Sequence, residues 1–405
     1  MNLLIAEYFS GGGYANRKLS GSVLSEAYGM VRSVISDFKT AGHDVTMLMD
    51  SRLKRFNPPN DALHTVWVSA PDEFWMKLKE HSGVADAVYV IAPESGQMLE
   101  KLVETVEVSG GTSLNCGVDA IKHVSNKMTF YEIMKKTGLK VPETVLLDVN
   151  EKNSDVRRLV EELGYPLVFK PLDGVSCSGL SVVRDGTGVD GAIRKVAQES
   201  TRKQFVAQKL IDGKAASACV FSSGKEAVAV TLNRQFVTLA PPDEESKYYG
   251  GVVPFNHVLG NEALMVAQRA VEAVKGLKGY VGVDLVLTDE TAFVMEVNPR
   301  LTASYIGLRH VVDFNPAEAI VDAVIKRKMP KDVQTSGYVF FSKVETPSSP
   351  KLLADTYKIK GVVSPPFPIE ENKPAYALLA AASTSLRGAQ SAFYRSKKRL
   401  LSFYS

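Results

Sequence analysis

The sequence predicts a mixed α/β and α+β protein, in which an open α/β unit precedes a two-lobed unit and a C-terminal extension. Over the first third of the chain, short apolar runs alternate with helical patterns, as in a parallel sheet covered by helices. From about residue 204 onward, strand-like runs follow one another with few helices between them, which favours antiparallel strands. The 405 residues also exceed what one hydrophobic core usually supports.

We expect the open α/β unit over residues 1–115. Its strands are predicted at 3–6, 45–49 and 87–92. Its helices are predicted at 22–40, 71–81 and 96–109. Because a helical pattern separates each strand from the next, the strands can run parallel to one another.

The two-lobed unit is expected over residues 116–330, with lobes at about 116–207 and 208–330. The first lobe is predicted to contain helices at 118–138, 154–163 and 189–200 and strands at 145–147, 167–170 and 204–210. The second lobe is predicted to contain strands at 218–222, 227–233 and 235–239, helices at 261–277 and 316–326, and a hairpin of the runs 282–287 and 292–296. The C-terminal extension, 331–405, is predicted to be β-rich around 338–344 and to end in a basic helix at 384–401.

The composition is that of a globular protein. Hydrophobic residues make up 45% and charged residues 23% of the sequence, and a net charge of +3 does not predict a nucleic-acid-binding surface. The three cysteines, Cys116, Cys177 and Cys219, lack the spacing of a zinc site or a disulfide framework. The N-terminus reaches an acid at Glu7 without a basic segment, and no apolar run is long enough to span a bilayer. We therefore expect a cytoplasmic protein with neither nucleic acid nor membrane as a partner.

The strongest chemical signal is a set of oxygen side chains on the predicted hairpin. Asp284 lies on its first strand, and Glu296 and Asn298 lie at the end of the second, just before Arg300. Residues two apart on a strand share one face, so Glu296 and Asn298 project together. Acids on a strand often only face solvent, but here the neighbouring residues are apolar, and a buried acid needs a partner. Two carboxylates and an amide oxygen suit Mg²⁺.

A second signal is Lys170, which ends an apolar strand and leads into a Gly/Ser loop with Gly174, Ser176, Ser178 and Gly179. Such a loop can turn its backbone N–H groups toward phosphate oxygens, although many Gly/Ser loops are only turns. A third signal is the strand end at 208–210, which can present backbone groups to an adenine edge. Lys127, in a predicted helix, is the fourth.

In this order and spacing, the four elements resemble the ATP-grasp superfamily over roughly residues 122–308. The resemblance implies an ATP-grasp fold with an N-terminal pre-ATP-grasp domain. It implies that Lys127 and Lys170 contact the phosphates of ATP and that the 173–179 loop closes over them. It also implies an adenine hinge formed by Gln208, Lys209 and Leu210. The metal site that it implies is formed by Asp284, Glu296 and Asn298.

The implied activity is an ADP-forming ligation of a carboxylate to an amine through an acyl phosphate, with Arg300 holding that intermediate and Lys170 assisting phosphoryl transfer. The implied cofactors are ATP and Mg²⁺, with Mn²⁺ as an alternative ion. One departure from the superfamily is Ala215, because many members carry a ribose-binding glutamate there. The expected partners are a small carboxylate and a small amine, and the number of subunits, including a homo-oligomer, stays open.

Segments 7–13, 232–235 and 248–254, and also Ser22, Glu26, Ala27 and Met30, are similar to one branch of the superfamily, the tyramine–L-glutamate ligases. This likeness makes L-glutamate and tyramine the first candidate substrates. It predicts that 7–13, 233–235 and 249–251 line the substrate cleft, with Glu7 receiving an ammonium group and Tyr248 or Tyr249 contacting a ring. The alternatives are another amino-acid or peptide ligase, a bicarbonate-using member, and a nucleotide-binding protein without catalysis.

Overall fold

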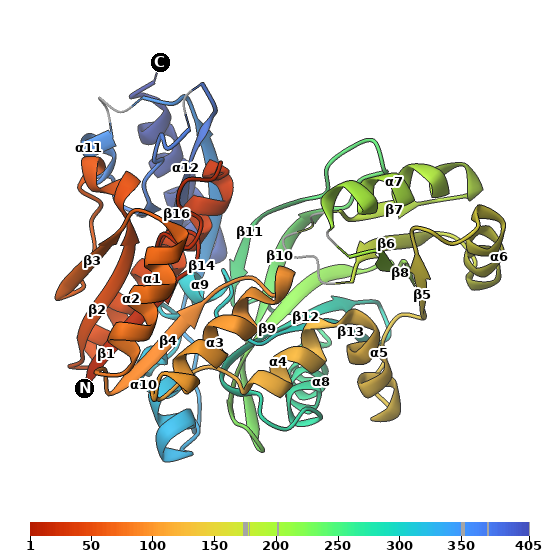
Figure 1. The fold of residues 1–405 in the computed structure, drawn as a ribbon, viewed down its shortest axis with the longest axis horizontal. Coiled ribbons are helices and arrows are strands. Elements are labelled where there is room, and N and C mark those ends of the chain that lie inside the picture. The colour runs from red at the N-terminus through yellow and green to blue at the C-terminus, as the bar shows by residue number, and fades with distance from the viewer. Residues whose placement is uncertain (173–176, 178, 201, 350–352, 371, 405) are drawn as a thin grey trace.

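The structure, a computed structural model, describes residues 1–172, 177, 179–200, 202–349, 353–370 and 372–404, and three β-sheets organise this part of the chain (Figure 1). The N-terminal sheet is parallel and has the order β3-β2-β1-β4. Its strands are β1 (Asn2–Glu7), β2 (Asp44–Asp50), β3 (His64–Val68) and β4 (Ala87–Ile91). The helices around it are α1 (Gly21–Thr40), α2 (Pro71–Ser82) and α3 (Met98–Val108), with the short 3₁₀ helices η1 (Ser51–Phe56) and η2 (Ser95–Gln97).

Both faces of the N-terminal sheet are covered by helices. Leu3 and Ile5 of β1 pack with α1, whereas Leu4 and Ala6 point to the opposite face and pack with α2 and α3. Burial on both faces explains why the strands are continuous apolar runs. The predicted alternation of strands and helices is confirmed, and β3 is an additional strand that we did not predict.

The second sheet, with the antiparallel order β5-β8-β6-β7, forms the lobe on the right of Figure 1. Its strands are β5 (Thr144–Asp148), β6 (Leu167–Pro171), β7 (Ser181–Val183) and β8 (Gln204–Lys209). Two helices, α4 (Val118–Ser125) and α5 (Lys127–Lys136), precede it, and α6 (Asn153–Leu163), η3 (Gly186–Gly188) and α7 (Val189–Glu199) accompany it. A core of its own lies between this sheet and the helices α6 and α7.

The third sheet has eight antiparallel strands in the order β13-β12-β9-β10-β11-β14-β16-β15. The strands are β9 (Lys214–Ser223), β10 (Ala227–Thr238), β11 (Lys247–Val253), β12 (Lys278–Leu287), β13 (Ala292–Asn298), β14 (Tyr338–Thr346), β15 (Val362–Ser364) and β16 (Ala375–Ser383). The prediction of two separate strands at 227–233 and 235–239 was wrong, because the single strand β10 runs through both ranges without a break. The predicted hairpin is confirmed as β12 and β13.

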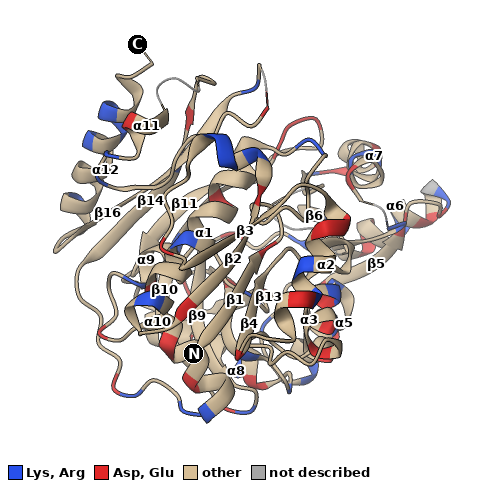
Figure 2. Cartoon of the chain, turned by 60° about the vertical axis from the view of Figure 1, so that its left-hand side comes forward, with Lys and Arg blue, Asp and Glu red and all other residues tan. Residues whose placement is uncertain are grey.

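Helices cover the third sheet at both ends. They are α8 (Gly260–Glu272), α9 (Tyr305–Leu308), α10 (Pro316–Val321), the π-helix η4 (Asp322–Lys326), α11 (Leu353–Thr356) and α12 (Leu386–Leu401). The basic residues of α12 are drawn in blue in Figure 2. The C-terminal strands extend the third sheet and also contact α1, so both ends of the chain lie on one side of the molecule (Figure 1). None of the helices in the described ranges is long and apolar enough to cross a membrane.

Glu7, at the end of β1, is only 2% exposed. Its carboxylate accepts hydrogen bonds from the backbone N–H and the hydroxyl of Ser10. Burial raises the pKa of Glu7 to about 7, although the hydrogen bonds from Ser10 act in the opposite direction. Glu7 is therefore enclosed in the N-terminal unit, and the expectation that it receives a substrate ammonium was wrong.

The buried carboxyl of Glu7 should make the stability of the protein depend on pH. Between the pKa of an unfolded glutamate and about 7, folded Glu7 keeps a proton that the unfolded chain has released. The free energy of unfolding therefore falls as the pH rises through this window, by roughly 3 kcal/mol. Glu7→Gln should remove this part of the slope, which urea denaturation at about pH 5 and about pH 8 would measure. An unchanged slope would show that Glu7 is ionised in the folded protein.

Candidate active site

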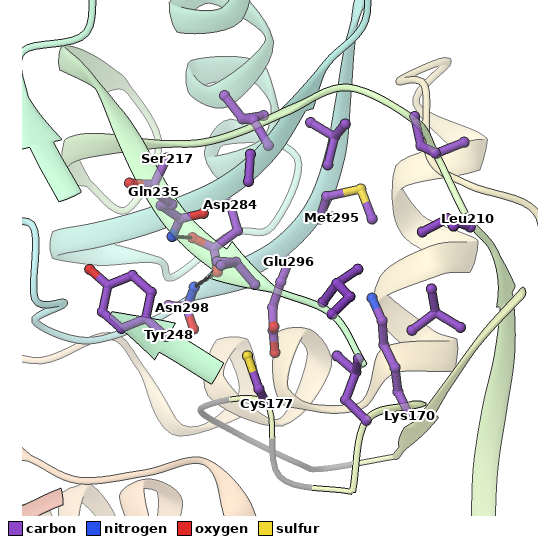
Figure 3. A pocket seen from close by; sticks show the side chains of 18 of the residues that line it. Lys170, Cys177, Leu210, Ser217, Gln235, Tyr248, Asp284, Met295, Glu296 and Asn298 are labelled. Atoms are coloured by element: carbon purple, nitrogen blue, oxygen red, sulfur yellow. Dashed lines mark hydrogen bonds between the residues drawn. The ribbon is translucent and has the colours of Figure 1, made fainter. Parts of the chain in front are cut away.

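A cavity of about 640 Å³ opens between the second and third sheets, and its lining reaches α1 of the N-terminal unit. Small-molecule sites commonly have volumes of roughly 300–1,000 Å³. Figure 3 shows Leu210 and Lys170 at one end of this cavity and Tyr248 at the other. Asp284 and Glu296 lie between the two ends.

The hairpin places its oxygen side chains on the wall of the cavity. The register of β12 and β13 pairs Asp284 with Glu296, and Asn298 follows two residues later on the same face. Asp284 Oδ1 accepts a hydrogen bond of 2.9 Å from Gln235 Nε2, and Oδ2 accepts one of 3.1 Å from Asn298 Nδ2. With its amide nitrogen turned toward Asp284, Asn298 keeps its carbonyl oxygen for another partner.

The two carboxylates have opposite pKa shifts. Burial and the charge of Glu296 raise the pKa of Asp284 to about 6. Burial is the largest single effect on Glu296 and acts to raise its pKa as well. The charge and hydrogen bond of Lys127, together with the charges of Lys170 and Arg300, outweigh burial, and the net shift of the pKa is downward. A cation near both carboxylates would relieve their repulsion, and the oxygen ligands fit Mg²⁺. No group of three or more His, Cys, Asp or Glu side chains in the described ranges could hold a metal ion, so Asn298 and substrate phosphates would complete this site.

Lys127 reaches the cavity because the helix predicted over 118–138 is broken in two. Asn126 has extended backbone angles, and its side chain accepts hydrogen bonds from the N–H groups of Met128 and Thr129, so it caps α5. Lys127 is the first residue of α5, and its Nζ lies 2.9 Å from Glu296 Oε1. The continuous helix was therefore a wrong prediction, and the break is what directs Lys127 toward Glu296.

Removing the cap at Asn126 should have two effects. Asn126→Ala should lower the free energy of unfolding by about 1 kcal/mol, the usual cost of a lost N-cap. It should also weaken ATP binding, because the cap fixes the start of α5 where Lys127 lies. Asn315→Ala is the matched control, since Asn315 caps α10 in the same manner. Urea denaturation and ATP titration of both variants would test this, and equal ATP affinities would contradict it.

Lys170 lies at the end of β6, where its Nζ donates a 2.7 Å hydrogen bond to Gln208 Oε1. Gln208 is held in turn by its Nε2, which donates to Thr144 Oγ1 at 3.0 Å. Burial, and then the charge of Lys127, lower the pKa of Lys170 to about 8. Two ammonium groups near each other in a partly buried site favour an anion between them. A polyphosphate is an anion of suitable size and charge.

The three residues of the expected adenine hinge, Gln208, Lys209 and Leu210, differ in whether they line the cavity. The backbone N–H groups of Lys209 and Leu210 donate to Glu143 and Pro166, and Lys209 Nζ donates to the carbonyl oxygens of Leu163 and Gly164. Gln208 is absent from the cavity lining among the described residues, whereas Lys209, Leu210 and the segment up to Gly213 line it. A purine edge would therefore meet the segment just after β8.

The Gly/Ser loop falls largely outside the described residues. Gly174, Ser176 and Ser178 are among the residues that the structure does not describe. Gly179 is described, has a positive φ of 67°, and donates its N–H to Glu199 Oε2 at 2.6 Å. The role expected for this loop stays a prediction.

Arg300 follows β13 and contacts the N-terminal unit. Its Nε lies 3.0 Å from both carboxylate oxygens of Glu94, and the side chains of both residues are largely buried. We did not predict a role for Glu94 from the sequence. The available signal was its place just after β4, because carboxyl ends of parallel strands are where α/β sheets bind ligands.

Several other expected cleft residues lie elsewhere. Gln235 and Tyr248 line the cavity, but Asn233 is buried, and its Nδ2 lies 3.3 Å from Cys219 Sγ. Tyr249 is 44% exposed and lies outside the lining. Arg234 NH1 donates to the backbone oxygen of Ala215 at 3.0 Å. Because side chains alternate in direction along a strand, Arg234 and Tyr249 point away from the face that carries Gln235 and Tyr248. Asn233 shares the face of Gln235 but is buried.

Two family models match the chain. The first model, described as "ATP-grasp domain", matches residues 124–304. The second model, described as "pre ATP-grasp 3 domain", matches residues 43–121. The chain belongs to the ATP-grasp superfamily. The ATP-grasp match contains every candidate residue from Lys127 to Arg300. The fold expected from the sequence, an ATP-grasp fold with a pre-ATP-grasp domain, is confirmed.

This ATP-grasp protein has relatives that match most of its length. It is 26% identical over 312 residues to tyramine–L-glutamate ligase of Methanocaldococcus jannaschii, covering 76% of this chain and 84% of that protein. An ATP-grasp superfamily protein from Archaeoglobus fulgidus has a TM-score of 0.65 and 20% identity, covering 95% of this chain and 99% of that one. The L-amino acid ligase from Bacillus licheniformis has a TM-score of 0.67 and 14% identity, covering 98% and 97%. At these identities the two structural matches establish the fold alone.

Proposed function

We propose that this ATP-grasp protein is an ADP-forming ligase that phosphorylates the carboxylate of one substrate and transfers its acyl group to an amine. The observation that carries the proposal is the meeting of Lys127, Lys170, Asp284, Glu296 and Arg300 around one cavity. Cations and carboxylates from separate elements converge there. Phosphoryl transfer needs this kind of positioned charge.

Each group of residues has a distinct task in this proposal. Lys127 and Lys170 bind phosphate oxygens, and the 210–213 segment contacts the adenine. Asp284, Glu296 and Asn298 would hold Mg²⁺, or Mn²⁺ in its place, which when bound neutralises charge on the phosphates. Arg300 binds the oxygens of the reacting carboxylate. Its ion pair with Glu94 fixes the guanidinium in the cavity wall.

The reaction then follows from positioning. A carboxylate oxygen attacks the γ-phosphorus, the bond from this phosphorus to the β–γ bridging oxygen breaks, and ADP leaves. The amine nitrogen attacks the carbonyl carbon of the acyl phosphate. Arg300 stabilises the oxyanion of the tetrahedral intermediate, and the carbon–oxygen bond then breaks. Inorganic phosphate departs and takes up the extra proton of the nitrogen.

Within this class of reaction, we propose L-glutamate as the carboxylate substrate and tyramine as the amine. The support is the likeness to the tyramine–L-glutamate ligase of Methanocaldococcus jannaschii over 312 residues. The cavity also contains groups suited to such substrates, since it combines Arg300 with the ring of Tyr248. A guanidinium suits a carboxylate, and an aromatic ring suits a second ring.

The test is a coupled assay of ADP release with Mg·ATP, L-glutamate and tyramine, together with mass spectrometry for the glutamyl amide. We expect ADP release that requires both substrates and matches the amide formed. Omission of each substrate in turn is the control. ADP release with other amino acids, without amide from this pair, would leave the ligase reaction standing and reject the named substrates.

A further inference from the structure

The cavity continues beyond the metal-binding residues, away from the adenine end. Tyr248 lies there, on the opposite side of Asp284 and Asn298 from Lys170 and Leu210 (Figure 3). Glu26 of α1 lines the same cavity, and its charge acts on Arg300 as well as on Tyr248. The acyl carbon must lie next to the γ-phosphate, so an amine that attacks it arrives from this side. We call this region, formed by Glu26 and Tyr248, the acceptor end.

Three distant segments meet at the acceptor end. Glu26 comes from α1, Tyr248 from β11 and Lys343 from β14. Lys343 Nζ lies 3.2 Å from Glu26 Oε2 and 5.8 Å from the centre of the Tyr248 ring. Both charged side chains are mostly buried, with 20% of Glu26 and 17% of Lys343 exposed. Because Lys343 is already fixed beside the ring and the carboxylate, it orients Glu26 rather than moving freely in solvent.

One oxygen of Glu26 is still available. Lys343 contacts Oε2, and Oε1 has no hydrogen-bond partner among the described residues. A carboxylate can accept several hydrogen bonds, so an ammonium in the cavity can bind Oε1 while Lys343 keeps Oε2. The neighbouring ring offers an apolar surface to whatever carries that ammonium.

We propose that Glu26 and Tyr248 form the subsite for the amine substrate. Glu26 binds the primary ammonium group and accepts a proton from it, which leaves the neutral nitrogen that attacks the acyl carbon, and Tyr248 contacts an aromatic substituent. This inference rests on the proposed ligase function. In this proposal the amine, and not the carboxylate substrate, binds where the N-terminal unit contacts the third sheet. Recognition of the amine then depends on the N-terminal unit, which supplies Glu26.

The experiment separates the two half-reactions. With L-glutamate and no amine, reversible acyl-phosphate formation is followed by exchange of ¹⁸O between bridging and non-bridging positions of ATP. The complete reaction is followed by ADP release with tyramine or ethylamine. Variants are Glu26→Gln, which keeps the side-chain shape, and Tyr248→Leu, which removes the ring. Glu100→Gln is the matched control, because Glu100 pairs with Lys122 outside the cavity lining.

We expect Glu26→Gln to raise the KM for both amines by roughly 10–100-fold, the usual effect of losing a charged hydrogen-bond partner. Isotope exchange with L-glutamate alone should change much less than the KM for the amines, because the first half-reaction needs no amine. Tyr248→Leu should raise the KM for tyramine more than that for ethylamine, and Glu100→Gln should match the wild type. Unchanged amine KM values in Glu26→Gln, or a raised KM for L-glutamate instead, would overturn the subsite.

Failure of the ligase function would give a different result. Without isotope exchange or ADP release in the wild type, the proposed function itself is rejected. Calorimetric titration of tyramine into the protein with Mg²⁺ and a non-hydrolysable ATP analogue tests the subsite independently of turnover. Weaker binding to Glu26→Gln than to the wild type would support the subsite, and equal binding would overturn it.

Discussion

Glu296→Gln should abolish most of the turnover while leaving the fold intact. The substitution keeps the shape of the side chain and removes one of two carboxylates on the hairpin face, so the site holds a divalent ion less well. The expected loss is about 3–4 kcal/mol of transition-state stabilisation, or roughly 150–900-fold in turnover. Steady-state ADP release over a range of Mg²⁺ concentrations measures it, and circular dichroism checks the fold.

Glu290→Gln is the matched control for Glu296→Gln. Glu290 lies in the exposed turn of the same hairpin, between β12 and β13. Its substitution therefore makes the same chemical change at a position outside the cavity. It should leave turnover unchanged. Near-wild-type turnover of Glu296→Gln at saturating Mg²⁺ would reject Glu296 as a metal ligand.

Lys170→Met should weaken ATP binding. Methionine preserves the apolar stem, so the main loss is the ammonium group that Gln208 orients at a distance of 2.7 Å. The loss of a charge-assisted hydrogen bond to phosphate should raise the dissociation constant for ATP by roughly 10–100-fold. Titration calorimetry with a non-hydrolysable ATP analogue and Mg²⁺ measures the effect directly.

The control for Lys170→Met is Lys225→Met, at an exposed position between β9 and β10. This variant should bind the analogue like the wild type. If Lys170→Met also binds and hydrolyses ATP normally, Lys170 does not contact a phosphate.

The local parts of the fold could be predicted from the sequence. The alternation of Leu3 to Ala6 with the following helix identifies a buried strand, and the apolar residues around Asp284 and Glu296 identify a hairpin. These patterns depend on burial within a few residues of one another, so periodicity reveals them. The same reasoning found the strand end at Lys170.

The missed features depend on partners distant in sequence. Nothing in the 118–138 pattern requires a break at Asn126, and the break becomes visible only when its side chain caps α5. Arg234 interrupts an apolar run and suggested two strands, yet within β10 it donates to Ala215 and lies over Phe255. Local sequence cannot foresee such contacts.

The candidate site shows the same limit. Lys127 and Glu296 are both recognisable in the sequence, but their contact at 2.9 Å requires the whole fold. Glu26 lines the cavity, and Glu94 pairs with Arg300 of the cavity wall, because the N-terminal unit packs against the third sheet. The sequence marked Glu26 only as part of the family resemblance and did not mark Glu94. Long-range packing of this kind decides which acids face the substrates.

Transfer of ¹⁸O from the carboxylate to phosphate tests the central claim most directly. With L-glutamate labelled in its carboxyl oxygens, tyramine and unlabelled Mg·ATP, attack on the γ-phosphorus places a carboxylate oxygen in the phosphate that is later released. We predict one ¹⁸O atom in each molecule of inorganic phosphate, detected by ³¹P nuclear magnetic resonance, with an equal amount of ADP. Release of unlabelled phosphate together with amide would contradict the acyl-phosphate route.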